Sequence, residues 1–113
     1  MTQPPFPPCI MALPRANTPH ACLHAWLLRS PDGLLMFYTV DDLLELPEHA
    51  HNDQWGVVLE GSMEFTIDGV QRTYTRGDSY FIPANVPHSV RIPAGAAGID
   101  FFQDADRYPV TLS

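Results

Sequence analysis

Three histidines and a glutamine have the residue types and the spacing that could begin a metal site. His49 and His51 stand at positions i and i+2, and on a β-strand this spacing points both imidazoles to the same face. Two imidazoles on one face are the start of a site for a first-row transition metal. Gln54 follows across an expected tight turn at residues 52–53, and His88 offers a third imidazole at the head of a later strand.

The elements that must position these residues have the pattern of short β-strands. From residue 23 onward, short apolar runs are separated by Pro, Gly and Asp-Gly turn signals. Met63, Phe65 and Ile67 alternate with polar residues, which is typical of a strand with one buried face. The expected strands span residues 23–29, 34–40, 43–47, 54–60, 63–67, 70–75, 79–82, 89–93 and 98–103. This pattern predicts an all-β sandwich or barrel.

The first 19 residues differ from the rest because they hold six of the twelve prolines. Proline removes a backbone donor and restricts the residue before it, so this segment is predicted to be an extended arm rather than a helix or a central strand. The arm is either loose or held against the surface by its apolar side chains. These are Phe6, Ile10, Met11 and Leu13.

The charge and the composition exclude several classes of function. The net charge is −7, so nucleic acid and anionic membranes are not expected partners. There is no lysine, which excludes Schiff-base chemistry on this chain. No apolar run reaches the length of a membrane helix and the N-terminus has no signal-peptide pattern, so we expect a cytoplasmic protein. Cys9 and Cys22 form no C-x-x-C pair and are expected to be reduced thiols of no assigned role.

The residues around the histidines resemble the two motifs of the cupin family. The first motif, G-x5-H-x-H-x3,4-E-x6-G, is matched by His49, His51 and Gly61. The second, G-x5-P-x-G-x2-H-x3-N, is matched by Gly77, Pro83 and His88. The resemblance implies a double-stranded β-helix, or jelly-roll barrel, over residues 20–113 as a single cupin domain. It also implies a divalent transition metal held by the three histidines.

Four positions depart from the family pattern. Gln54 replaces the motif glutamate and comes one residue early, and the other replacements are Leu43, Asn85 and Ile92. The stretch HNDQWGVVLEG is similar to a subgroup of stand-alone cupins with a Gln-Trp-Gly strand, and the similarity covers about residues 13–108. Cupins that ketonise unsaturated uronates also carry a glutamine in place of the glutamate, although theirs comes later after the second histidine.

The role of each polar candidate has an alternative. Gln54 either binds the metal directly or orients an imidazole or a bound water from outside the ligand set. Asp53 is a rival ligand, but an aspartate here is more typical of a turn. Glu60 is expected at the barrel rim. His20 and His24 lie outside both motifs and are expected at the surface.

The predicted function is that of a small metal-binding cupin, with zinc, nickel, manganese or iron as the possible metal. Since Gln54 brings no negative charge to the ion, we expect an anionic small-molecule ligand and a metal-dependent enzyme with isomerase, ketonisation or lyase-type chemistry on a small carboxylate or sugar acid. The alternatives are a non-catalytic binding or sensing cupin and a metal-dependent dioxygenase.

A homodimer is expected from the strand that carries Gln54. If Gln54 points inward, strand alternation sends Trp55, Val57 and Leu59 outward. Such an apolar exterior is unusual for a monomer. A second copy in a two-fold dimer would cover it most simply, and the N-terminal arm is the alternative cover.

Overall fold

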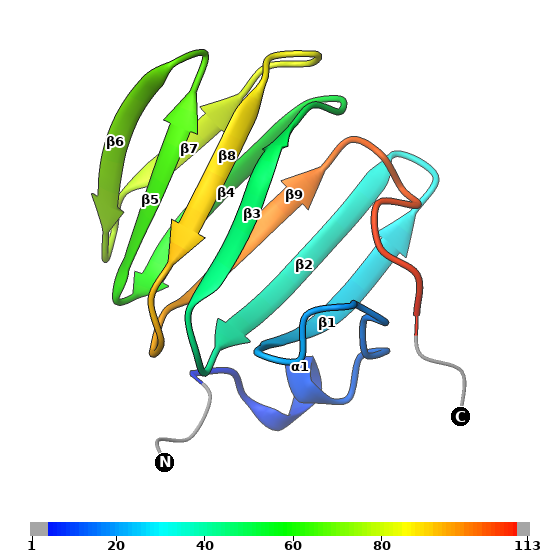
Figure 1. Ribbon diagram of the computed structural model, residues 1–113. Helices are drawn as coiled ribbons and strands as arrows, with labels where there is room; N and C mark the ends of the chain where they lie inside the picture. The colour runs from blue at the N-terminus through cyan, green and yellow to red at the C-terminus, as the bar shows by residue number, and fades with distance from the viewer. Residues whose placement is uncertain (1–4, 111–113) are drawn as a thin grey trace.

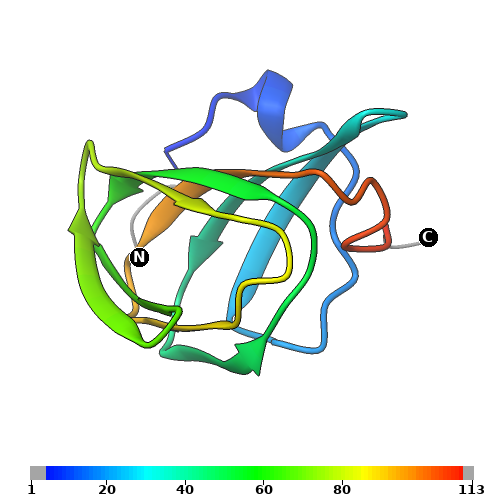
Figure 2. The ribbon, with the colours of Figure 1, turned by 90° about the horizontal axis from the view of Figure 1, so that it is seen from above.

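Two antiparallel β-sheets face each other in this computed structural model, which describes residues 5–110 (Figure 1). The five-stranded sheet contains, in spatial order, β1 (Leu23–Ser30), β2 (Gly33–Val40), β9 (Ala97–Phe102), β4 (Gln54–Glu60) and β7 (Ser79–Ile82). The four-stranded sheet contains β3 (Leu44–His49), β8 (His88–Ile92), β5 (Ser62–Ile67) and β6 (Val70–Thr75). From above, the sheets are the two walls of a flattened barrel (Figure 2). The all-β jelly-roll barrel expected from the sequence is confirmed.

Turns at the predicted positions set the strand pairing. The β5–β6 hairpin turns at Asp68 and Gly69, whose φ angles of 50° and 78° are the left-handed values that a type I′ turn requires. Asn85 takes a φ of 65°, so it adopts the conformation of the glycine that it replaces in the cupin motif. The strand prediction is less exact at the metal motif. β3 ends at His49, its pairing with β8 is irregular between Leu46 and His49, and His51 lies beyond the strand.

The core lies between the two sheets and is formed by the inward-facing side chains of both. In β2 and β4, buried and partly exposed residues alternate, as expected for strands with one face toward a core. The largest fully buried side chains come from both walls and are Leu27, Leu34, Val40, Val58, Met63 and Ile82. Burial of these apolar surfaces is the main favourable contribution to folding.

The described part of the N-terminal arm packs on the outside of the five-stranded sheet (Figure 2). Phe6 is buried there, with its ring centroid 5.9 Å from Trp26 and 5.7 Å from Phe37. The arm also contains one turn of helix, α1 (Pro8–Met11), so the prediction that it holds no helix is wrong. Pro8 is compatible with this turn because the first helical residue needs no N–H partner. No helix within residues 5–110 is long and apolar enough to cross a membrane.

The segment after β9 lies at one side of the barrel and is fastened at both ends (Figure 2). At one end, the carboxylate of Asp104 accepts hydrogen bonds from the backbone N–H and the side-chain amide of Asn52, at 3.1 and 2.6 Å. At the other end, the N–H of Asn17 donates to the carbonyl of Pro109 at 2.7 Å. This fastening holds residues 103–110, called here the C-terminal strap, at the side of the barrel, where Arg107 and Tyr108 line a pocket together with His49 and His88.

Removing the Phe6 ring tests whether the arm is part of the folded domain. We expect Phe6→Ala to lower the free energy of unfolding by about 1.5–3 kcal/mol, since a buried phenylalanine contributes that much. Met11→Ala is the control, because Met11 is 39% exposed in the same arm and its loss should change stability by under about 0.5 kcal/mol. Denaturant unfolding measures both. Equal effects of the two substitutions would mean that Phe6 does not anchor the arm.

Candidate metal centre

The three predicted histidines come together at one end of the barrel. His49 at the end of β3 is paired in register with His88 at the start of β8, and their ring centroids are 4.3 Å apart. The ring of His51, from the loop after β3, lies 4.7 Å from His88 and 5.4 Å from His49. One potential ligand nitrogen from each ring lies within 4.8 Å of the others. The triad therefore could hold one metal ion.

Backbone carbonyls fix the orientation of all three rings. The Nδ1 atoms of His49, His51 and His88 lie 2.7, 2.8 and 3.0 Å from the carbonyl oxygens of Pro47, Asn52 and Val86, respectively. A carbonyl only accepts, so each Nδ1 carries the proton and each Nε2 keeps a free lone pair. This tautomer is the one that a metal-binding imidazole needs.

The Nε2 atoms show that the site fits a cation. Those of His51 and His88 are buried and have no hydrogen-bond partner among the described residues. A buried polar atom without a partner is costly, and a metal ion would satisfy both nitrogens. Burial lowers the pKa of His51 and of His88, so both rings are held in the neutral form that binds metal.

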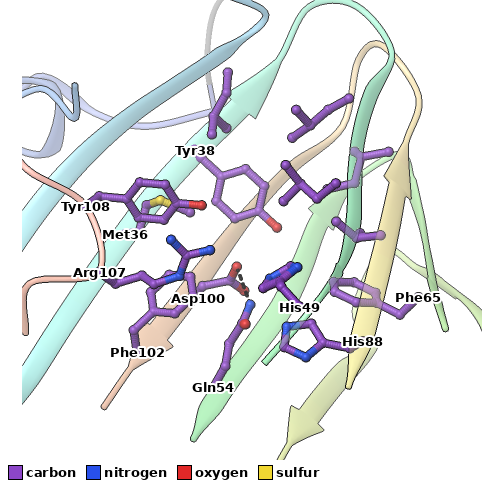
Figure 3. A pocket seen from close by; sticks show the side chains of 15 residues that line it. Met36, Tyr38, His49, Gln54, Phe65, His88, Asp100, Phe102, Arg107 and Tyr108 are labelled. Carbon is purple, nitrogen blue, oxygen red and sulfur yellow. Dashed lines mark hydrogen bonds between the residues drawn. The ribbon is translucent and has the colours of Figure 1, made fainter. Parts of the chain in front are cut away.

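Gln54 lies beside the triad but faces a second group as well. It is buried on β4, and its Nε2 donates to the Oδ2 of Asp100 at 3.1 Å. Figure 3 shows its amide between Asp100 and the rings of His49 and His88. Because the amide nitrogen is taken by Asp100, the Oε1 atom is the one available to a metal or to a metal-bound water. Direct ligation by Gln54 stays a prediction.

The other polar candidates lie outside the triad. Asp53 accepts the N–H of Ala84 through its Oδ1 at 2.7 Å, which is a loop-bridging contact. Glu60 is exposed at the end of β4. The Nε2 of His24 lies 2.7 Å from a carboxylate oxygen of Asp41, away from the histidine cluster.

A carboxyl that the sequence reasoning missed lies next to Gln54. Asp100 on β9 is buried and also accepts a short hydrogen bond from the hydroxyl of Tyr80. The Tyr80 oxygen in turn lies 3.2 Å from the hydroxyl of Tyr38. Burial raises the pKa of Asp100 to about 7, against the opposing effect of its two hydrogen bonds. Asp100 is therefore close to half-protonated near neutral pH.

Two inward-facing glycines make room for this chain of polar groups. A Cβ atom at Gly56 would lie 1.9 Å from the Oδ1 of Asp100 and 2.4 Å from the Tyr80 ring and hydroxyl. A Cβ at Gly98 would lie 2.8 Å from the hydroxyl of Tyr38. Neither position tolerates a side chain without moving these groups, so the glycines define where the polar chain can lie.

Arg107 of the C-terminal strap completes the pocket from its mouth. Its guanidinium lies 4.6 Å over the ring of Tyr108, and its Nε is buried without a hydrogen-bond partner among the described residues. No carboxylate of residues 5–110 forms an ion pair with it. Figure 3 shows Arg107 and Tyr108 on one side of the pocket and His49 with His88 on the other. The pocket is partly open and its volume is about 40 Å³, which is room for one or two waters or a small polar group.

Sequence reasoning missed Asp100 and Arg107 for different reasons. Asp100 could have been found, because the predicted strand at residues 98–103 places it on the same face as Gly98 and Phe102. Arg107 lies outside any strand, and only the fastening of the strap turns it toward the barrel.

This geometry agrees with the comparisons with known proteins. The family model described as a cupin domain matches residues 38–97, and the chain belongs to the cupin family. It is 29% identical to the quercetin 2,3-dioxygenase of Bacillus subtilis strain 168, over 74% of this chain and 31% of that protein. The chain thus spans about a third of the length of this curated relative.

Solved structures show the same fold. An RmlC-like cupin from Shewanella frigidimarina is 29% identical with a TM-score of 0.73, and the match covers 83% of this chain and 86% of that one. The structure of KdgF from Halomonas sp. is 22% identical with a TM-score of 0.66, over 76% of this chain and 82% of that one. The second likeness is one of fold alone.

The raised pKa of Asp100 predicts a pH-dependent difference in stability. We compare the free energy of unfolding of the metal-free wild type with that of metal-free Asp100→Asn. As the pH rises from about 4 to about 7, the wild type should become less stable relative to the variant by about 4 kcal/mol in total. Above about pH 7 this difference should not change further. The sign follows because the folded state keeps the Asp100 proton up to a higher pH than the unfolded state does.

Denaturant unfolding of both proteins across this pH range measures the difference. The lowered pKa values of His51 and His88 act in the opposite direction, but both proteins share them, so they cancel in the comparison. Parallel stability curves for the two proteins would contradict a raised pKa at Asp100.

Proposed function

We propose that this cupin is a metal-dependent enzyme that moves a proton on a small carboxylate or sugar acid, in an isomerase, ketonisation or lyase-type reaction. The observation that carries the proposal is Asp100, a buried carboxyl with a pKa of about 7 in the pocket that His49 and His88 also line. A carboxyl with this pKa both accepts and returns a proton near neutral pH, as general acid–base catalysis requires.

His49, His51 and His88 would hold the metal through their Nε2 atoms, with the Oε1 of Gln54 as the proposed fourth ligand. Zinc, nickel, manganese and iron all accept such a set of ligands. When bound, the ion supplies a Lewis acid that polarises a carbonyl or carboxylate oxygen of the ligand. Three neutral imidazoles and an amide leave its double positive charge uncompensated, which favours an anionic ligand.

Arg107, at the mouth of the pocket, also favours a small ligand with a carboxylate group. A guanidinium with a buried Nε and no carboxylate partner is suited to a carboxylate, which it can bind with two parallel hydrogen bonds. The small volume of this partly open pocket favours a ligand whose carboxylate end enters the barrel. Arg107 would bind and orient that end, while Asp100 exchanges the proton at a neighbouring carbon.

The groups around Asp100 would control its two protonation states. The Tyr80 hydroxyl and the Gln54 amide donate to the carboxylate and lower the cost of its ionised form. The apolar surroundings oppose ionisation, and this balance leaves the pKa near 7. The same two donors fix the direction of the carboxylate, so the proton would be taken from a defined side of the ligand.

A dioxygenase is the second candidate, and the resemblance to quercetin 2,3-dioxygenase favours it. We rank it lower because a neutral Gln54 stabilises a trivalent metal less than the usual cupin glutamate does. A non-catalytic binding or sensing cupin is the remaining alternative, and the ionisable Asp100 in the pocket speaks against it. The cytoplasmic location and the homodimer stay predictions.

Loss of two histidines tests the metal centre. We expect the double substitution of His49 and His88 by alanine to leave the fold intact and to reduce bound metal from about one ion per chain to none, because one imidazole and one amide are too few ligands. Elemental analysis of untagged protein, with circular dichroism as the check on folding, measures this. An unchanged metal content in the double variant would place the metal elsewhere.

Hydrogen–deuterium exchange tests the proposed reaction. In D₂O, metal-loaded protein should catalyse exchange of the hydrogen on the carbon next to the carbonyl group, for at least one acid in a panel of small 2-oxo acids and keto sugar acids. Proton NMR follows this exchange. Asp100→Asn should slow the exchange about 10²- to 10⁴-fold, the usual contribution of a general acid or base. Arg107→Met should act mainly on KM, since it removes an interaction with the ligand's carboxylate.

The matched control is Asp106→Asn, an exposed acid on the same C-terminal strap, which should exchange at the wild-type rate. Exchange that is equally fast in Asp100→Asn would reject Asp100 as the proton carrier. Oxygen consumption with the same panel, in place of exchange, would favour the dioxygenase.

A further inference from the structure

The side chain of Tyr108, in the C-terminal strap, lines the pocket of the metal centre, and the residue is only 8% exposed. Tyr108 accepts a hydrogen bond through its backbone carbonyl, but its hydroxyl has no hydrogen-bond partner among residues 5–110. A tyrosine hydroxyl this far inside a protein usually has one. The Tyr108 hydroxyl is therefore free to bind a group that enters the pocket.

The second phenol of the pocket differs, because it is already paired. The hydroxyl of Tyr38 lies 3.2 Å from the Tyr80 oxygen and 3.1 Å from the Met63 sulfur. Tyr80 in turn donates to the carboxylate of Asp100. These groups satisfy one another before any ligand binds, whereas the hydroxyl of Tyr108 stands apart from their network.

Several contacts hold the Tyr108 ring in place, and none of them uses its hydroxyl. The guanidinium of Arg29 donates to the Tyr108 carbonyl, and the N–H of Asn17 donates to the next carbonyl, that of Pro109, at 2.7 Å. The ring of Phe102 lies edge-on to the Tyr108 ring, with the centroids 5.7 Å apart. A phenylalanine would make all of these contacts. Packing alone thus does not account for a phenol at this position.

A turn in the strap lets two successive side chains face the same pocket. The N–H of Arg107 donates to the carbonyl of Asp104 at 3.1 Å and closes this turn. Neighbouring side chains of an extended chain point to opposite sides. Here, in contrast, the guanidinium of Arg107 lies 4.6 Å over the ring of Tyr108. Figure 3 shows both side chains on one wall of the pocket, with the Tyr108 hydroxyl directed into it.

The surroundings keep the Tyr108 hydroxyl protonated. Burial raises the pKa of Tyr108, the cation of Arg107 opposes this rise, and the nearby charge of Asp100 adds to it. At neutral pH the phenol is therefore a neutral hydrogen-bond donor. Such a donor is suited to an oxygen on which negative charge develops during a reaction.

Two neighbouring donors on one wall limit the ligands that fit them. Because Arg107 stacks on the Tyr108 ring, a carboxylate bound by the guanidinium would lie close to the edge of the phenol. A pocket volume of about 40 Å³ leaves room for few atoms beyond that carboxylate. The Tyr108 hydroxyl then meets an atom bonded next to the carboxylate, and a donor requires an acceptor there. A 2-oxo acid has an oxygen at this position.

We propose that the Tyr108 hydroxyl binds the keto oxygen of a 2-oxo acid whose carboxylate is bound by Arg107. This inference rests on the proposed function and narrows its ligand class. When the C–H bond next to the keto group breaks, the proton passes to the carboxylate of Asp100. The electron pair forms a C=C bond, and the keto oxygen gains the negative charge of an enolate. Tyr108 donates a hydrogen bond to that oxygen and keeps its own proton, and the reverse steps return the proton to carbon.

Two unreactive probes test this site without turnover. Oxamate has a carboxylate and an adjacent carbonyl oxygen, whereas acetate has the carboxylate alone. In zinc-loaded protein, Tyr108→Phe should weaken oxamate binding about tenfold, the effect of one lost hydrogen bond, and acetate binding less than about twofold. Arg107→Met should weaken the binding of both probes. Isothermal titration calorimetry measures the affinities, and circular dichroism with metal content checks the folding of each variant.

The matched control is Tyr74→Phe, because Tyr74 is a half-buried tyrosine on β6 that does not line the pocket. It should bind both probes like the wild type. An unchanged oxamate affinity in Tyr108→Phe would overturn the proposal, as would an equal loss in Tyr74→Phe. A wild type that binds neither probe at about 10 mM would also overturn it.

The exchange reaction in D₂O separates this inference from the proposed function. Tyr108→Phe should lower kcat about 10²- to 10³-fold, the usual loss for one donor at a developing oxyanion. A wild-type kcat in this variant would overturn the role of Tyr108 and leave that of Asp100 intact. If no acid exchanges with the wild type but oxamate binding still depends on Tyr108, the proposed function is rejected and the assignment of the Tyr108 hydroxyl to the second ligand oxygen is supported.

Discussion

The site depends on one constraint, that three imidazole lone pairs must point at the same buried place. An imidazole whose tautomer and ring rotation are not fixed points an Nε2 lone pair at this place only part of the time. Here the carbonyls of Pro47, Asn52 and Val86 each hold one Nδ1 proton and leave each Nε2 bare. The Pro47 carbonyl belongs to β3, and those of Asn52 and Val86 belong to loops at the same end of the sandwich. The pairing of β3 with β8 and the bond of Asp104 to Asn52 therefore help to hold the three carbonyls in place.

The opposite wall of the pocket follows a different physical rule, namely that buried polar groups must satisfy one another. Asp100, Tyr80 and Tyr38 lie in an otherwise apolar barrel, and each has at least one hydrogen-bonding partner within the group. The last hydroxyl, that of Tyr38, lies between the Tyr80 oxygen and the sulfur of Met63, a weak acceptor at the apolar end, and its one proton can be donated to only one of them at a time. The polar chain therefore begins at the metal-binding end through Gln54 and ends inside the core.

Much of the fold could be predicted from the sequence, because strand alternation and turn residues are local signals. The Asp68-Gly69 turn, the left-handed Asn85 and the inward face of β4 all depend on single residues or on a period of two. The triad could be predicted because the histidines occupy spaced positions in two short motifs. Even so, His51 reaches the site from a loop and not from the strand face that its spacing suggested.

What could not be predicted depends on contacts between distant segments. Phe6 docks on Trp26, twenty residues away, and the helical turn that follows it spans only Pro8–Met11, which is too short to show a helical periodicity in the sequence. Arg107 turns toward the barrel because Asp104 binds Asn52, a contact across half of the chain. The raised pKa of Asp100 is likewise a property of its surroundings, since an aspartate in solution ionises well below pH 7.

The two inward glycines have a meaning for related sequences. The histidine motif indicates only that a barrel can bind a metal. It does not indicate whether a side chain that can carry a proton lies beside the ion. Glycine at positions 56 and 98 supplies that information, because a Cβ atom at either position would force Asp100, Tyr80 or Tyr38 to move from where it lies here. In a small cupin, glycine at these two positions therefore indicates that the barrel has room for acid–base groups beside the metal site.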